Sequence, residues 1–112
     1  MTKSWAFLLN EKLINFQYVD FMIKHLVIKI YGLVQGVLFR TSAKNKANEL
    51  GLKGYVQNLE DGSLIIEIEG EEDRLNNFLS WCRDGPPWAK VGKIDFDFDN
   101  EIKYYKDFII KK

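Results

Sequence analysis

The segment from Gly32 to Arg40 contains two glycines and an arginine that could together bind an anion. Gly32 and Gly36 stand four residues apart, which lets the backbone curl so that successive N–H groups point into one concavity. A helix that begins directly after this loop would add N–H donors at its N-terminus. Arg40 contributes a planar, permanently charged guanidinium that can grip two phosphate oxygens together. Taken alone, the loop could also be an ordinary turn, and it lacks the Gly-Lys-Ser/Thr ending of a Walker loop.

A second group with chemical potential is the amide of Asn58, which we place at the end of a strand. It precedes Asp61-Gly62, a pair that indicates a hairpin turn. An amide offers one acceptor and one donor group, and positioning a neutral water molecule requires both. Without further context Asn58 would be interpreted as a polar residue that serves the turn.

The elements that must position these residues alternate between strands and helices over residues 24–112. Period-two alternation predicts the strands, and apolar residues at helical spacing predict the helices. The predicted strands cover residues 25–31, 52–58, 63–69, 91–98 and 108–110, and the predicted helices cover 41–50 and 71–83. Strand, helix, strand, strand, helix, strand is the ferredoxin-like split βαβ order, an α+β sandwich. Right-handed crossovers place both helices on one face of a mixed, mostly antiparallel sheet, and the hairpin then lies near the first loop.

The two segments together resemble the two signatures of the acylphosphatase family. Gly32 to Arg40 matches the form Gly-x-Val-Gln-Gly-Val-x-Phe/Tyr-Arg at every fixed position. Gly54 to Gly70 matches Gly-aromatic-Val-x-Asn-x-x-x-Gly-x-Val, then five residues and Gly, except that Leu64 replaces the valine. This replacement is a core exchange of small expected effect. The resemblance covers about residues 24–112, and residues 85–91 also look like the family's loop before the fourth strand.

This resemblance implies a hydrolase that cleaves the carboxyl–phosphate bond of acyl phosphates without a metal, a cofactor or a covalent intermediate. It implies catalytic roles for Arg40, which binds the phosphate, and for Asn58, which orients the attacking water. The implied phosphate-binding backbone is that of Gly32, Leu33, Val34, Gln35, Gly36 and Val37. The chemistry agrees, because a carboxylate is a good leaving group. The protein therefore needs mainly to hold the phosphate, align the water molecule with it and neutralise the charge that develops.

The alternative is a non-catalytic acylphosphatase-like module that binds an acyl or carbamoyl phosphate, or a protein partner. Such a domain heads larger carbamoyltransferases of hydrogenase maturation, where zinc-finger cysteines follow it. The present chain has one cysteine, which favours a free-standing enzyme.

Composition narrows the remaining classes of function. The 112 residues suit one domain, and sixteen basic residues balance sixteen acidic ones, so a nucleic-acid or anionic-membrane partner is not indicated. One cysteine and one histidine argue against a zinc site, and a lone cysteine fits the reducing cytoplasm. We therefore expect a cytoplasmic monomer. Cys82 is expected in the core, His25 at the surface, and Glu67 and Glu69 facing water.

Residues 1–23 lie outside the strand and helix rhythm and form an N-terminal extension of unknown role. Its apolar run from Trp5 to Leu9 is too short for a secretion signal or a bilayer span. A functional extension, an accessory segment, and a true start at Met22 all remain open. The stripe that could form an amphipathic helix consists of Trp5, Leu8, Leu9, Leu13 and Phe16.

Overall fold

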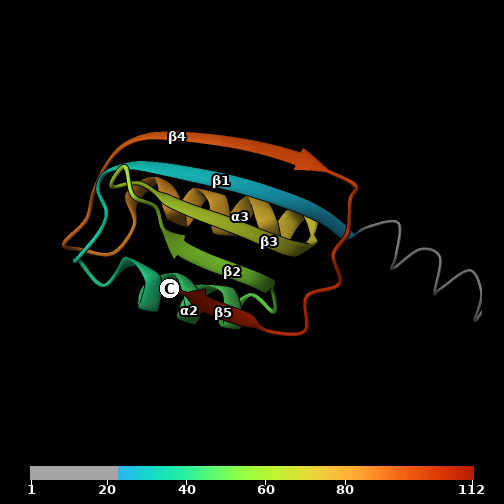
Figure 1. The fold of residues 1–112 in the computed structure, drawn as a ribbon. Helices are drawn as coiled ribbons and strands as arrows, with labels where there is room; N and C mark the ends of the chain where they lie inside the picture. The colour runs from blue at the N-terminus through green and yellow to red at the C-terminus, as the bar shows by residue number, and fades with distance from the viewer. Residues whose placement is uncertain (1–22) are drawn as a thin grey trace, which may run out of the picture.

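The strands form one five-stranded sheet in the computed structural model, which describes residues 23–112 (Figure 1). The strand order is β4-β1-β3-β2-β5, and only the β2–β5 pair is parallel. The strands are β1 (Ile23–Leu33), β2 (Lys53–Asn58), β3 (Leu64–Glu71), β4 (Lys90–Asp99) and β5 (Phe108–Lys111). The helices are α2 (Phe39–Glu49) and α3 (Glu72–Asp84). The predicted ferredoxin-like α+β sandwich is confirmed, whereas the expectations for residues 1–22, including a start at Met22, lie outside the described residues.

The core lies between the two helices and one face of the sheet. Leu26, Ile28 and Ile30 of β1 stand opposite Ile68, Ile66 and Leu64 of β3, and all six are buried. Each strand therefore contributes alternate residues to the core, as period-two patterning predicts. The helices close it with Phe39, Ala43, Ala47, Leu75, Phe78, Leu79 and Cys82.

Cys82 is buried in this core, as expected. Burial raises the pKa of its thiol, because the thiolate would lose its hydration there. The reactive form of cysteine is the thiolate, so this position suits packing rather than nucleophilic chemistry.

The opposite face of the sheet corrects two predictions. His25 was expected at the surface, but it is only 2% exposed, and its ring nitrogens lie 2.9 Å from Glu67 Oε1 and 3.0 Å from Asp99 Oδ1. Glu69 was expected to face water, but it is 5% exposed and accepts backbone N–H groups of Tyr104 and Tyr105 at 2.9 and 3.3 Å. Both predictions were wrong because the connection between β4 and β5 crosses this face.

One glycine of the sheet offers a test of backbone packing. Gly54 has φ +152°, and a Cβ there would lie 1.9 Å from the carbonyl oxygen of Glu67. Gly62 has φ +90° but open space around such a Cβ. Because Gly54→Ala adds a clash to backbone strain, we expect it to lower the free energy of unfolding by at least about 3 kcal/mol.

Gly62→Ala is the matched control, since it adds backbone strain without a steric clash. We expect it to lower the free energy of unfolding by about 1–2 kcal/mol. Urea denaturation of both variants measures the difference. Equal losses would show that the close approach of β2 to β3 at Gly54 adds nothing.

Candidate active site

The loop between β1 and α2 begins where β1 and β4 approach each other closely. At Gly32 (φ +127°) a Cβ would lie 2.3 Å from the carbonyl oxygen of Lys90 in β4. The pairing register of β1 and β4 also shifts between Tyr31 and Gly32. Gly32 thus permits strand contact, while Gly36 (φ +74°) supplies the left-handed turn inside the loop.

A pocket of about 200 Å³ lies where this loop, the start of α2 and the end of β2 meet. It brings together four of the predicted site residues, Val34, Gly36, Arg40 and Asn58. The complete lining is Val34, Gly36, Leu38, Phe39, Arg40, Thr41 and Asn58. Of the predicted loop, Gly32, Leu33, Gln35 and Val37 do not line it.

The sequence patterns missed Leu38, Phe39 and Thr41 as lining residues because they placed the helix start too late. The helix was predicted from Thr41, but α2 begins at Phe39. The first turn of an α-helix has N–H groups without partners inside the helix, and here residues of that turn line the pocket. The Phe39-Arg40 pair at the end of the first signature was the signal that could have indicated these residues.

Arg40 provides the positive charge of the pocket. The preceding Phe39 is buried and packs edge-to-face on Trp81, with ring centroids 5.5 Å apart, which anchors the helix start beside Arg40. Among residues 23–112 the ion pairs join other side chains, and none includes the Arg40 guanidinium. A guanidinium without a carboxylate partner in a small pocket favours an anionic ligand.

Asn58 brings an unsatisfied acceptor to the same pocket. Its Oδ1 is buried, and within residues 23–112 no donor lies within hydrogen-bonding distance of it. An unpaired buried acceptor costs about 1–3 kcal/mol. A donor that enters the pocket and bonds this oxygen would recover that cost, and water is the smallest such donor.

Gln35 joins the loop to the hairpin that carries Asn58. Its Nε2 donates to the carbonyl oxygens of Leu59 at 2.8 Å and Ser63 at 3.0 Å. The same hairpin is closed by the bond from Leu59 N–H to the Ser63 carbonyl oxygen at 2.9 Å. The side chain of Gln35 therefore fixes the distance between the two halves of the pocket.

Asp61 links the hairpin to Lys29 of β1. Its carboxylate accepts the hydroxyl and, at 2.9 Å, the backbone N–H of Ser63, and it lies 3.2 Å from Lys29 Nζ. The Ser63 hydrogen bonds, aided by Lys29, hold the pKa of Asp61 at about 2. The hairpin beside Asn58 is thereby tied to β1 at neutral pH.

Removing the Gln35 amide is expected to loosen the pocket. We expect Gln35→Ala to cost about 1–2 kcal/mol of unfolding free energy, since two hydrogen bonds are lost. We also expect a fall in kcat of roughly tenfold to hundredfold if the pocket catalyses hydrolysis, because small displacements of an aligned group are costly.

Gln57→Ala is the control, because that side chain donates only to the carbonyl oxygen of Lys112 at the exposed chain end. Urea denaturation and steady-state kinetics of both variants test this role. A kcat of Gln35→Ala equal to that of the native chain would show that the bridge does not align the site.

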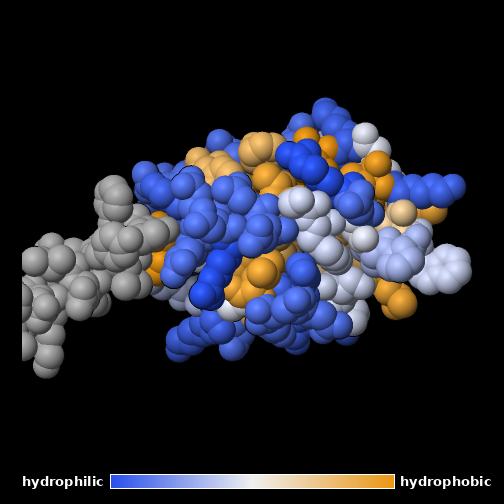
Figure 2. Space-filling model, turned by 180° about the vertical axis from the view of Figure 1, so that it is seen from behind, coloured by the Kyte–Doolittle hydropathy of each residue, from blue (hydrophilic) through white to orange (hydrophobic). Residues whose placement is uncertain are grey.

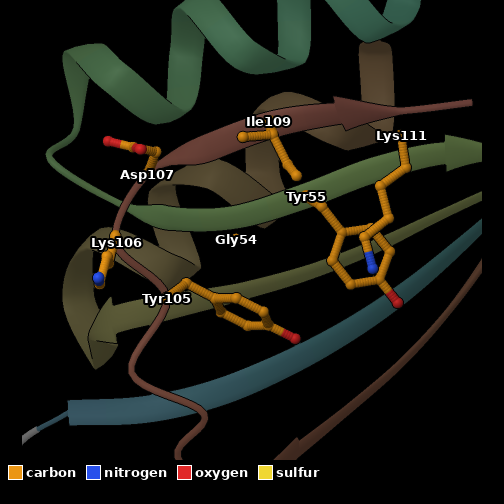
Figure 3. Close-up of a pocket in the computed structure, with 7 residues that line it drawn as sticks. All are labelled: Gly54, Tyr55, Tyr105, Lys106, Asp107, Ile109 and Lys111. Atoms are coloured by element: carbon orange, nitrogen blue, oxygen red, sulfur yellow. The ribbon is translucent and has the colours of Figure 1, made fainter.

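A second pocket of about 220 Å³ lies across β2 and β5 (Figure 3). Two of its polar groups already have partners within the fold: the Tyr55 hydroxyl donates to Glu67, and Lys111 Nζ lies 3.8 Å from the centroid of the Tyr55 ring. Burial raises the pKa of Tyr55 above its ordinary value, so its hydroxyl stays neutral. This pocket has no arginine and no unpaired buried amide oxygen like that of Asn58.

The family model described as acylphosphatase matches residues 26–110 of this chain. The chain belongs to the acylphosphatase family. The acylphosphatase of Thermotoga maritima is 43% identical over 88 residues, which are 79% of this chain and 97% of the relative. The solved structure of an acylphosphatase from Coxiella burnetii has a TM-score of 0.78 and 33% identity, and the match covers 82% of this chain and 96% of that one.

Acylphosphatase-like domains also occur within larger proteins. The structure of full-length HypF in a phosphate- and nucleotide-bound form has a TM-score of 0.75 and 37% identity to this chain. That match covers 80% of this chain but 12% of HypF. Within residues 23–112, neither helix is long and apolar enough to cross a membrane.

Proposed function

We propose that this chain is an acylphosphatase that cleaves the carboxyl–phosphate bond of acyl phosphates, releasing a carboxylate and inorganic phosphate. The observation that carries the proposal is the pocket that combines the uncompensated guanidinium of Arg40 with the unpaired amide oxygen of Asn58. One group suits an anion and the other a hydrogen-bond donor such as water. Hydrolysis of a phosphate derivative needs both.

The loop from Gly32 to Val37, the first turn of α2 and Arg40 bind the phosphate in this proposal. Val34 and Gly36 of the loop and residues of the helix start line the pocket, which supports this role, since a glycine-containing loop before a helix N-terminus can offer backbone N–H groups to an anion. Arg40 neutralises charge that develops on the phosphoryl oxygens in the transition state. Residues of this chain line the pocket, and we propose that the active form is a monomer.

Asn58 orients the nucleophile in this mechanism. Its amide oxygen accepts a hydrogen bond from a water molecule and aims it at phosphorus, opposite the leaving carboxylate. The water oxygen forms the new bond to phosphorus, the bond from phosphorus to the carboxyl oxygen breaks, and the leaving group keeps that electron pair. A phosphoryl oxygen accepts the water proton, so no side chain needs to act as general base.

A non-catalytic phosphate-binding module is the second candidate, and the likeness to part of HypF is the observation that favours it. Hydrolysis of benzoyl phosphate by the native chain in the presence of EDTA separates the two. Turnover in EDTA supports a metal-independent enzyme. Binding of inorganic phosphate in calorimetry without turnover would refute the enzyme and support the module.

A further inference from the structure

Leu38 has an uncommon backbone conformation, and its side chain does not pack in the core. It is the N-cap of α2 with φ 63° and ψ 21°, in the left-handed region, and makes no capping hydrogen bond. Ser, Thr, Asp, Asn and Gly are the residues favoured at an N-cap, and glycine tolerates positive φ without strain. The side chain of Leu38 is also 68% exposed, so core packing does not account for a leucine here.

Leu38 lies at the mouth of the candidate active site. It lines the pocket yet remains mostly in contact with solvent. Hydrophobic residues reach the surface at this end of the molecule, on the right in Figure 2. An exposed leucine on a strained backbone beside an anion-binding pocket is typical of a functional position rather than a structural one.

The size of the pocket determines which part of a substrate would contact the side chain of Leu38. At about 200 Å³ the pocket is smaller than the range of about 300–1,000 Å³ that encloses drug-sized ligands. It can take a phosphoryl group beside Arg40, and a larger acyl group must then project through the mouth. The lining contains three apolar side chains, Val34, Leu38 and Phe39, beside the polar Thr41 and Asn58. Val34 and Phe39 are buried, so Leu38 is the apolar lining residue that an acyl group outside the pocket would meet.

We propose that Leu38 is a specificity-determining residue that contacts the acyl group and favours acyl phosphates with an apolar, ring-sized acyl group over small ones. This inference rests on the proposed hydrolysis of acyl phosphates. Contact with an apolar group removes apolar surface of both partners from water. A small acyl group, such as acetyl, is too short to make the same contact.

The test compares benzoyl phosphate with acetyl phosphate as substrates of the Leu38→Ala variant. Alanine keeps a Cβ on the left-handed backbone but removes the rest of the apolar side chain. We expect kcat/KM for benzoyl phosphate to fall about tenfold, mainly through KM, and kcat/KM for acetyl phosphate to fall less than about twofold. Ile109→Ala, at a half-exposed aliphatic residue of β5 outside this pocket, should leave the ratio of the two values as in the native chain.

A second variant separates contact from strain. Leu38→Gly relieves the positive φ, so its urea midpoint should be higher than that of Leu38→Ala, while the preference for benzoyl phosphate is lost in both. Equal losses for the two substrates, or an unchanged ratio in Leu38→Ala, would overturn the inference and leave the proposed function intact. Failure of the folded native chain to hydrolyse either substrate would instead refute the proposed function.

Discussion

Replacing Arg40 with glutamine is expected to lower kcat/KM for benzoyl phosphate by at least about 10²–10³-fold. Arg40 lies in the pocket at the start of α2, and no ion pair within residues 23–112 uses its guanidinium. Its whole charge is therefore available for the phosphoryl oxygens, where it counts more in the transition state than in the ground state. Affinity for inorganic phosphate should fall in the same variant.

The stability of Arg40→Gln should remain within about 0.5 kcal/mol of the native value, since a half-buried side chain that has no ion-pair partner within residues 23–112 is exchanged. Lys44→Gln, also on α2 but outside the pocket, is the matched loss of one positive charge. Steady-state kinetics and urea denaturation of both variants provide the comparison. A similar activity loss in Lys44→Gln would mean that net charge, and not the guanidinium in the pocket, governs turnover.

Replacing Asn58 with alanine should separate activity from stability. We expect kcat to fall by about 10²–10³-fold with KM nearly unchanged, because the amide aligns water and does not hold the phosphate. The free energy of unfolding should stay level or rise by about 1 kcal/mol, since the variant removes a buried acceptor that has no donor within residues 23–112. A variant that is inactive yet no less stable is the signature of a functional polar group.

Asn58→Asp serves as the complementary variant. It keeps the shape of the amide but places a carboxylate opposite the phosphate, so KM for benzoyl phosphate should rise as well as kcat fall. Measuring kcat, KM and urea denaturation for both variants tests these roles. Full activity in Asn58→Ala would show that another group positions the water.

The sequence by itself determined the elements and their order. Alternation of apolar residues in β1 and β3 dictates which residues enter the core, because successive side chains of a strand point to opposite faces. The glycines, the arginine and the amide of the two signatures are local patterns, and so the central site residues Arg40 and Asn58 could be named from them. Their presence in one pocket followed from the split βαβ order.

Only the tertiary structure decided the environment of residues that distant segments cover. His25 and Glu69 alternate like solvent-facing residues, but the connection between β4 and β5 covers them. The partners come from distant segments: Asp99 at the end of β4 for His25, and the backbone of Tyr104 for Glu69. Periodicity describes a strand and its two faces, and it contains no information on which later segment crosses a face. Burial of these polar side chains depends on that crossing.

The finer geometry of the site was likewise decided by packing. The bridge from Gln35 to the hairpin and the strained backbone of Leu38 arise because the loop must span from the end of β1 to a helix whose start Phe39 anchors in the core. Sequence spacing fixes how many residues make that span, whereas their dihedral angles follow from where the two ends are held. The sequence therefore indicated which groups are candidates for the chemistry, and the tertiary structure decided where they lie and what lies beside them.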